Sequence, residues 1–482
     1  MNITLLTDFY ELTMMQGYFK SGEGKKKAVF DLFYRNNPNN GGYSICAGLS
    51  QVVDYIKNIR FTDEDIAYLR SLSTFEDDFL EYLKDFKFTG DIYAIPEGTV
   101  VFPREPLLRV TSSLIEAQFI ETTILNIINH QCLIATKASR VVWAAHGDKV
   151  LEFGLRRAQG PDAGLYGARA AIIGGCLSTS NVLAGQKFDV PVSGTHAHSW
   201  VMSFDDEITA FRKYAEIFPK NCILLVDTYD TLRSGIPNAI TVFSELREKG
   251  KLYKGYGIRL DSGDFSYISE KAREMLDEAG FSDAVICASS DLDEYIITSL
   301  KQQGTEISVW GVGTNLITSK DCPAFGGVYK LSAEEHNGEF IPKIKISENP
   351  DKITNPGVKK IFRLYDKNTG KIKADLIALD HEKIDEGKDL TIFDPLATWK
   401  TMTLKAGKFY AKELLQPVFI NGECVMEERS VMEIQKYCSK EMSTLWPEYK
   451  RFVNPHILPV DLSDELFDLK KKMVSGLFDK KE

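Results

Sequence analysis

The alternation of apolar and polar positions divides the chain into three stretches with different patterns. In the first stretch, 1–112, short apolar runs bounded by turn residues predict strands at 28–34, 42–47, 91–95 and 107–110. Apolar positions at helical intervals predict helices at 51–58, 63–71 and 75–86. Ser113 and Glu116 then have the spacing of a capping box, and the pattern beyond them predicts one long helix that reaches about residue 145 and bridges two lobes.

The second stretch repeats a strand-then-helix pattern. Its apolar runs, each followed by a turn rich in Gly or Asp and then by a helical stretch, lie at 150–153, 179–183, 189–193, 223–226, 255–260, 284–288, 307–310 and 327–331. Strands that alternate with helices predict parallel βα units. Seven or eight such units favour a compact α/β barrel, and a doubly wound open sheet is the alternative.

The third stretch is again rich in predicted strands. The runs 360–365 and 371–379 flank the turn DKNTG and predict a hairpin, and apolar positions from 431 to 442 lie on one face of a predicted helix. We therefore expect three segments: an N-terminal α+β lobe with the bridging helix at 1–148, an α/β barrel at 149–346, and a C-terminal segment at 347–482 that packs on the N-terminal lobe.

The composition excludes several classes of protein. The 482 residues carry 58 Lys and Arg against 68 Asp and Glu, a formal charge of −10 without a long basic run, which disfavours a nucleic-acid partner. No apolar run approaches the roughly 18 residues that a membrane span needs, and the first residues lack the basic segment of a secretory signal. Eight widely spaced cysteines, without a CxxC pair, predict reduced thiols in a cytoplasmic protein.

Candidate chemistry collects directly after the predicted strands of the second stretch. The clusters are EFGLRRAQGPDAG, SGTHAHS, VDTYD, RLDSGD, ASSDLDE and GVGTN. Because parallel strands end on the same side of a sheet, the residues after them converge on one surface, where barrel and open-sheet enzymes carry their active sites. The sequence therefore predicts one site in the barrel, built from these clusters.

The last cluster has the character of a phosphate site. Gly311 and Gly313 allow close approach of the backbone to an anion, and Thr314 adds a hydroxyl at the start of a helix. By itself the motif also fits a simple tight turn. Ser289 and Ser290, at the end of the preceding strand, make the phosphate interpretation the better one.

The arginines of these clusters are candidates for contacts with an anionic substrate, although two adjacent arginines such as Arg156 and Arg157 are also often only solvated. Arg259 can bind a carboxylate bidentately, and Asp261 can accept hydrogen bonds from a ribose diol or bind Mg²⁺, although the two side chains can also pair with each other. Arg156 and Arg157 follow a strand end. Strand alternation directs them to opposite sides, so we expect at most one of them to face the site.

His196 and His198 lie two apart, which on a strand places both on one face. Such a pair can clamp a metal, with a carboxylate from Asp227 or Asp261, or one ring can react while the other supports it; a buried structural pair is the third option. No later histidine falls at a predicted strand end of the barrel region, which disfavours a barrel metallohydrolase.

Several long motifs, in order, resemble the nicotinate phosphoribosyltransferase family over essentially the whole chain. They are LLTDFYELTMMQGYF, FGLRRAQGPDAG, PVSGTHAHS, LLVDTYD, GIRLDSGD, WGVGT and GGVYKL. The resemblance implies a type II phosphoribosyltransferase fold, an irregular α/β barrel with an α/β sandwich lobe formed from both ends of the chain. It also implies that nicotinate and 5-phosphoribosyl 1-diphosphate give nicotinate mononucleotide and diphosphate in the salvage route to NAD.

The resemblance further implies coupled ATP hydrolysis through a phosphohistidine, which makes the enzyme formally a ligase, and Mg²⁺ on the diphosphate. By motif position His198 carries the phosphate, Tyr10 and Thr195 contact nicotinate, Arg259 pairs with its carboxylate and Thr314 contacts phosphate. Further ribose-phosphate contacts fall on Arg157, Asp261, Ser290, Gly311 and Gly313. The family also implies a homodimer with an N-terminal aromatic residue near the partner's site. The cysteine-rich zinc knuckle of some relatives is missing from this sequence, so we expect no structural zinc.

Three alternatives stay open at this point. Nicotinamide or quinolinate can replace nicotinate as the base, because base choice is not readable from composition. A barrel metallohydrolase built on the HAH pair is the second alternative, and a non-catalytic sugar-phosphate binder is the third.

Overall fold

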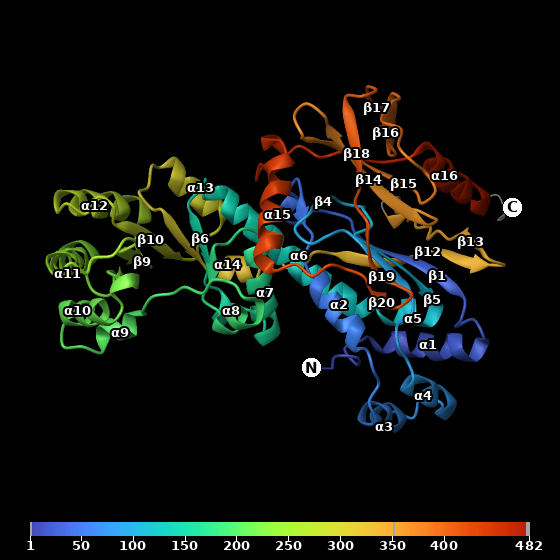
Figure 1. Cartoon of the computed structure of the whole chain (residues 1–482), viewed down its shortest axis with the longest axis horizontal. Coiled ribbons are helices and arrows are strands. Elements are labelled where there is room, and N and C mark those ends of the chain that lie inside the picture. Colours follow the sequence, from blue (N-terminus) through green and yellow to red (C-terminus); the bar gives the residue numbers. More distant parts are fainter. Residues whose placement is uncertain (1, 350–351, 479–482) are drawn as a thin grey trace. The chain divides into compact units, whose positions relative to one another are not determined.

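The computed structural model describes residues 2–349 and 352–478, and its internal contacts divide the chain into two compact units. The first unit contains Met1–Leu133, Ala324–Arg429 and Lys436–Glu482, and therefore includes both ends of the chain. The second contains Ile134–Pro323 and Ser430–Gln435. The elements of both are labelled in Figure 1. The segment boundaries expected at 148 and 346 stay predictions.

The second unit is built on six parallel strands. They are β6 (Lys149–Glu152), β7 (Ser178–Thr179), β8 (Ile223–Leu225), β9 (Gly257–Leu260), β10 (Val285–Ser290) and β11 (Val309–Val312). Their spatial order is β7-β6-β11-β10-β9-β8, and every pair is parallel. Since the first strand, β6, pairs with the last, β11, the strands follow one another in chain order around a ring.

The segment 191–196 closes this ring between β7 and β8. On the β7 side, Thr179 N donates to Pro191 O at 3.0 Å and Thr179 O accepts from Ser193 N at 3.0 Å. On the β8 side, Leu225 N donates to the His196 ring at 3.3 Å. The mixed α/β fold class with a parallel sheet is confirmed. The segment 191–196 is not a strand, an arrangement that is consistent with the expected irregular barrel.

Two predicted barrel strands were wrong. The run 189–193 forms one isolated bridge rather than a strand, because Asp189 adopts a left-handed conformation and Pro191 has no N–H to donate. The run 327–331 does form a strand, β12 (Gly327–His336), but it pairs antiparallel with β1 (Lys27–Tyr34) in the first unit. Local sequence predicts that a strand forms there, and long-range packing decides which sheet it joins.

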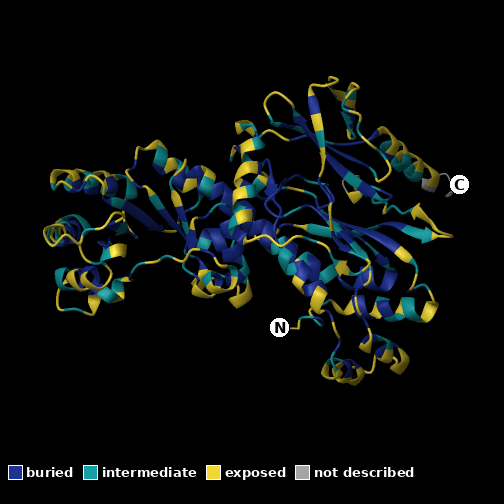
Figure 2. Cartoon of the chain, viewed as in Figure 1, coloured by how far each residue is buried: buried dark blue, intermediate teal, exposed yellow. Residues whose placement is uncertain are grey.

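Helices follow the barrel strands. They are α7 (Pro161–Ile173), α8 (Val182–Phe188), α9 (His198–Met202), α10 (Glu207–Ile217), α11 (Ile236–Glu248), α12 (Phe265–Glu278), α13 (Glu294–Gln302) and α14 (Thr314–Ile317). The strands between them are mostly buried, whereas the helices carry the exposed positions (Figure 2). The side chains of Asp264 and Asp293 accept backbone hydrogen bonds at the N-termini of α12 and α13, so these two acids of the predicted clusters act as helix caps.

The first unit contains a seven-stranded sheet of order β13-β12-β1-β5-β3-β19-β20 and a four-stranded sheet of order β18-β14-β15-β21. Beyond β1 and β12, the larger sheet consists of β3 (Asp91–Ala94), β5 (Leu108–Ser113), β13 (Glu339–Pro342), β19 (Gln416–Ile420) and β20 (Glu423–Cys424). The smaller sheet consists of β14 (Lys359–Asp366), β15 (Ile372–Leu379), β18 (Phe409–Glu413) and β21 (Val460–Leu462). The β14–β15 pair is the hairpin that the sequence predicts.

Short ribbons and helices complete the first unit. The ribbons pair β2 (Ser44–Ile45) with β4 (Val100–Val101) and β16 (Leu390–Asp394) with β17 (Ala397–Leu404). The helices are α1 (Phe9–Ser21), α2 (Leu49–Asn58), α3 (Asp63–Ser71), α4 (Asp77–Lys84) and α16 (Asp464–Phe478). No helix within 2–349 and 352–478 combines the length and the apolar character that crossing a membrane requires.

The predicted long helix is two helices, α5 (Leu114–Phe119) and α6 (Glu121–Ala144), and α6 contributes residues to both units. Ser113 caps α5 by accepting from Glu116 N at 3.4 Å. The Glu116 carboxylate instead accepts from Thr89 N at 2.7 Å and from Ser112 Oγ at 2.6 Å. Only the Ser113 half of the capping box is therefore formed, since the Glu116 carboxylate bonds to Thr89 and Ser112 instead. A further helix, α15 (Val431–Thr444), covers the predicted 431–442 face.

Candidate active site

A cavity of about 580 Å³ lies at the carboxyl ends of the barrel strands, entirely within the second unit. Five of the six polar clusters line it. The predicted site residues on its wall are Arg157, Thr195, His198, Arg259, Asp261, Ser290, Gly311, Gly313 and Thr314. The expectation that these strand ends meet around one hollow is confirmed. Tyr10 belongs to α1 of the first unit, where it is 45% exposed.

His198 forms a hydrogen bond to Asp227, an acid of the VDTYD cluster, whose residues are not among those that line the cavity. His198 is the first residue of α9. Its ring faces the cavity and is partly exposed, and its Nε2 lies 3.1 Å from Asp227 Oδ1. Asp227 is buried, with 2% of its side chain exposed, and its Oδ2 accepts from Asp261 N at 2.9 Å and Ser262 Oγ at 2.7 Å. If Nε2 carries the proton that Asp227 accepts, Nδ1 keeps its lone pair as a nucleophile. The strand-end position of VDTYD was the sequence signal for this acid.

His196 has a different environment. Its Nε2 accepts from Leu225 N at 3.3 Å, its Nδ1 lies 3.5 Å from Ala197 O, and its ring packs 4.5 Å from that of Tyr214. Burial lowers the pKa of His196 to about 4, so the ring is neutral near pH 7. Both ring nitrogens face protein groups, and the segment is not a strand. The HAH pair therefore does not present two imidazoles to one metal, as the metallohydrolase alternative requires.

Arg259 offers an incompletely used guanidinium to the cavity. Its Nη1 donates to Thr195 Oγ1, while its Nε is buried without a hydrogen bond among the described residues. Asp261, its predicted internal partner, instead accepts from Ser289 Oγ. Buried donors are normally paired, so a planar acceptor such as a ligand carboxylate fits this arginine.

The loops after β10 and β11 bring backbone close to the cavity. Ser290 has a φ of 144°, a conformation that residues with a side chain rarely adopt and that often marks a functional loop. A Cβ at Gly311 would stand 2.7 Å from the Phe153 ring, so only glycine fits there. Gly311, Gly313 and Thr314 thus form a smooth wall with a hydroxyl, as a phosphate subsite requires.

Arg156 and Arg157 both line the cavity, which corrects the expectation that at most one faces it. The prediction assumed strand alternation. Leu155–Arg157 is instead a 3₁₀ turn, on which neighbouring side chains do not point in opposite directions. With Arg259, three guanidinium groups line one cavity of an acidic protein.

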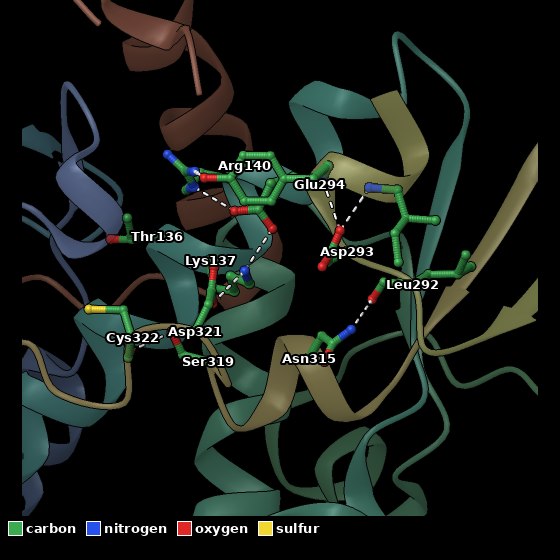
Figure 3. Close-up of polar contacts among 12 residues, drawn as sticks. Thr136, Lys137, Arg140, Leu292, Asp293, Glu294, Asn315, Ser319, Asp321 and Cys322 are labelled. Carbon is green, nitrogen blue, oxygen red and sulfur yellow. Dashed lines mark hydrogen bonds and ion pairs between the residues drawn. The ribbon is translucent and has the colours of Figure 1, made fainter. Parts of the chain in front are cut away.

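A buried ionic network supports the loop after β10, and the sequence did not predict it (Figure 3). Glu294, the fully buried first residue of α13, pairs with Arg140 at 2.7 Å and with Lys137 at 2.7 Å. Lys137 also contacts Asp321 at 2.7 Å. The sequence signal for this network was the presence of two cations, Lys137 and Arg140, on the apolar face of the long predicted helix.

The side-chain amide of Asn315 joins the loops after β10 and β11 (Figure 3). Asn315, directly after Thr314, donates from Nδ2 to Asp291 O at 3.1 Å and to Leu292 O at 3.2 Å. The loops after β10 and β11 are therefore fixed to one another, and Glu294 anchors the end of the first. Pre-organised backbone of this kind favours binding of an anion because little of it must be ordered on binding.

Comparisons with known proteins agree along the chain. Three family models match: the nicotinate phosphoribosyltransferase N-terminal domain at 5–129, the nicotinate phosphoribosyltransferase family at 149–365 and the C-terminal domain at 358–470. Nicotinate phosphoribosyltransferase of Bacillus subtilis is 48% identical over 473 residues, 98% of this chain and 95% of that protein. The human protein of the same name is 33% identical and covers 98% of this chain and 97% of its own length.

Solved structures give the same result. The crystal structure of human nicotinic acid phosphoribosyltransferase superposes with a TM-score of 0.84 at 31% identity, covering 97% of this chain and 99% of that one. Nicotinate-nucleotide pyrophosphorylase from Pyrococcus furiosus has a TM-score of 0.68 at 22% identity and supports the fold alone.

Proposed function

The chain belongs to the nicotinate phosphoribosyltransferase family, and from this premise we propose how its barrel cavity carries out the reaction. The enzyme transfers a phosphoribosyl group from 5-phosphoribosyl 1-diphosphate to nicotinate in NAD biosynthesis. Both substrates are anionic. The observation that carries the proposal is the single cavity in which three arginines, two backbone loops and His198 meet.

We assign the nicotinate carboxylate to Arg259 and Thr195. The free Nε and the Thr195 hydroxyl support a charge-assisted contact, which is stronger than a neutral one. Nicotinamide carries no charge at this position and quinolinate carries a second carboxylate. This arginine therefore favours nicotinate over the uncharged base.

The 5-phosphate is proposed to bind the Gly311–Gly313–Thr314 wall with Ser290, and the diphosphate to lie towards Arg157. Asp261, fixed by Ser289 and by its own backbone bond to Asp227, is proposed to hold the ribose diol. Breaking the bond at the anomeric carbon builds positive charge on the sugar. A pre-oriented carboxylate nearby stabilises that charge without reorganising.

Mg²⁺ is implied by the substrate, and the cavity fits it. The ion prefers oxygen ligands and is commonly bound by one or two carboxylates plus substrate phosphates. Asp261 and Asp291 line the cavity, whereas both oxygens of Asp227 are already engaged. We propose Asp261 and Asp291 as its protein ligands. When bound, Mg²⁺ neutralises charge on the departing diphosphate.

ATP coupling is proposed to use His198. Its Nδ1 attacks the terminal phosphorus of ATP, a nitrogen–phosphorus bond forms as the bond to the bridging oxygen breaks, and ADP leaves. Asp227 stabilises the positive charge that develops on the ring. The new phosphate adds about two negative charges beside the substrate, which favours the arrangement of the arginines that binds the phosphoribosyl donor.

A homodimer is the proposed assembly, with Tyr10 completing the partner's site. Phe9 and Tyr10 place two adjacent exposed aromatic rings on α1, and contiguous exposed apolar groups are typical of interaction surfaces. Mixing Tyr10→Ala and Arg259→Ala proteins at a nicotinate concentration too low for either variant to turn over well tests this assignment, since hybrid dimers contain one intact site. No recovery of activity would show that Tyr10 does not act across the dimer. A cytoplasmic location is also proposed, which is supported by eight cysteines that form no disulfide bond within the described residues.

Product identification tests the whole proposal. The protein is incubated with 5-phosphoribosyl 1-diphosphate, Mg²⁺, ATP and one base at a time. We expect nicotinate mononucleotide, diphosphate and ADP from nicotinate, and turnover at least ten times slower with nicotinamide or quinolinate. Preference for another base would reject the role of Arg259, and product without ADP would reject the coupling.

A further inference from the structure

A buried carboxylate lies beside the wall of the barrel cavity, at the carboxyl end of β6 (Figure 1). It belongs to Glu152, which is fully buried and is not one of the residues that line the cavity. Glu152 pairs with hydrogen-bond donors and, among the described residues, with no cation. Burying a carboxylate without a countercharge is unfavourable unless hydrogen bonds replace its hydration. The roles assigned to the cavity residues above do not account for this buried acid.

The two oxygens of this carboxylate bind two different loops. Oε1 accepts from Gly154 N, and Oε2 accepts from Thr179 Oγ1 at 2.5 Å. Burial raises the pKa of Glu152, and the two hydrogen bonds oppose this rise because they favour the ionised form. Thr179 Oγ1 in turn accepts from Asn181 N at 3.0 Å. The carboxylate therefore connects the loop after β6 with the loop after β7, whose Ser180 lines the cavity.

The loop after β6 carries two of the cavity arginines. Its 3₁₀ turn, Leu155–Arg157, is closed by a hydrogen bond from Arg157 N to Gly154 O at 2.8 Å. Gly154 is thus held through its N–H by Glu152 and through its carbonyl by the turn. Because the turn starts at Gly154, the position of that residue determines where Arg156 and Arg157 enter the cavity.

The loop after β11 packs on the same stretch of backbone. A Cβ at Gly154 would stand 2.4 Å from Cβ of Ile317, which belongs to α14, and 2.9 Å from Oε1 of Glu152, so Gly154 fits closely between these two residues. A Cβ at Gly313 would stand 3.2 Å from Phe153 O. Displacement of Gly154 would therefore disturb the arginine turn and the glycine wall together.

We propose that Glu152 is a positioning residue for the phosphoribosyl donor, because its carboxylate fixes Gly154 and Thr179 and thereby the loops that bind the phosphate groups. This inference rests on the proposed function, which places the donor in this cavity. Pre-organised loops bind an anion more tightly because little of the backbone must be ordered on binding. A negative charge near the cavity would by itself repel an anion. Positioning and simple electrostatics therefore predict opposite effects of removing the charge.

Calorimetric titration of the full chain with inorganic diphosphate and Mg²⁺ tests the proposal without turnover. Glu152→Gln keeps the size of the side chain but has one acceptor oxygen in place of two, so one of the two donors loses its acceptor. We expect the Kd for diphosphate to rise about tenfold or more, the effect of losing one hydrogen bond to a charged group. Thr179→Val should raise the Kd in the same direction, and Thr179→Ser, which keeps the hydroxyl, should restore it. An unchanged or lower Kd in Glu152→Gln and Thr179→Val would overturn the proposal.

Glu207→Gln is the matched control. Glu207 is a buried acid of the same unit that begins α10, accepts from Asn238 Nδ2 at 2.9 Å and does not line the cavity. Its variant should bind diphosphate as wild type does, and the same loss of affinity in Glu207→Gln as in Glu152→Gln would overturn the proposal.

Initial rates separate positioning from a general loss of structure. In Glu152→Gln and Thr179→Val the KM for 5-phosphoribosyl 1-diphosphate should rise more than the KM for nicotinate, because the base is assigned to Arg259 and Thr195. Equal rises in the two KM values would indicate a merely structural role and overturn the proposal. If Glu152→Gln does not fold, the Thr179 variants decide. Failure of wild type to bind diphosphate would instead reject the proposed donor site, and this inference with it.

Discussion

Two histidines that lie two positions apart in the sequence have opposite environments in this molecule. His196 is buried and neutral, with both ring nitrogens facing protein groups, whereas His198 is partly exposed in the cavity and bonded to Asp227. The difference arises because the chain turns into α9 between them. At the residue scale, we therefore expect the reactivity of His198 to depend on its hydrogen bond to Asp227 rather than on the HAH motif itself.

His198→Ala should abolish acid-labile labelling of the protein by γ-labelled ATP. Asp227→Asn should slow labelling by about 10–100-fold, because the amide does not stabilise the charged ring as a carboxylate does. His381→Ala is the control, since His381 is an exposed histidine of the first unit that contacts Glu465. Full labelling of His198→Ala, measured by scintillation counting, would assign the phosphate elsewhere.

Arg259→Ala should raise the KM for nicotinate by about 10–100-fold, the equivalent of one charge-assisted contact of about 1.5–3 kcal/mol. The KM of Arg259→Lys should lie between those of Arg259→Ala and wild type, because lysine keeps the positive charge but cannot bind a carboxylate bidentately. Arg233→Ala serves as control, its side chain being 90% exposed. Initial rates at saturating donor measure the effect, and an unchanged KM would end this role.

At the scale of elements, the site consists of strand ends whose loops are held from behind. Asn315 ties the loop after β11 to that after β10, and Glu294 anchors α13 to α6. The sequence located most barrel strands, because a short apolar run before a polar turn is a local signal. It missed the ionic network, because partners separated by more than 150 positions leave no local pattern.

Glu294→Gln should destabilise the barrel unit by about 3–5 kcal/mol, because the buried cations of Lys137 and Arg140 lose the carboxylate that they share, and Lys137 keeps its contact with Asp321. The midpoint of thermal unfolding should fall accordingly. Glu274→Gln, which breaks an exposed ion pair with Lys271 on α12, should change stability by less than about 0.5 kcal/mol. Equal midpoints of thermal unfolding for Glu294→Gln and Glu274→Gln would show that the ionic network does not stabilise the barrel unit.

At the scale of the whole molecule, pH changes stability through two groups whose protonation has opposite effects on the free energy of unfolding. The pKa of His196 is about 4 in the folded chain and near 6.5 when unfolded, so its protonation favours unfolding. Its contribution is full above pH 6.5 and is lost as the pH falls towards 4. Glu11 opposes it, because burial raises the pKa of Glu11 to about 7 and stability from this group grows as the pH falls from 7 towards 4.5.

Comparing wild type with His196→Gln separates the contribution of His196 to the pH dependence of stability from that of the other titrating groups. Between pH 7.5 and pH 5, wild type should lose about 2 kcal/mol more than His196→Gln, which has no ring to protonate. Urea unfolding at the two pH values measures this difference. His381→Gln should behave as wild type, since His381 is exposed. A parallel pH response in wild type and His196→Gln would contradict the buried, neutral assignment of His196.

The sequence by itself determined the chemistry-bearing residues and the side of the sheet on which they gather. Consecutive polar clusters after apolar runs are local features, and the parallel arrangement of βα units makes strand ends converge whatever the details of packing. Only the tertiary structure decided that both Arg156 and Arg157 line the cavity and that β12 joins the other unit's sheet. The former depends on a tight turn and the latter on long-range strand pairing, and neither has a period that can be read along the chain.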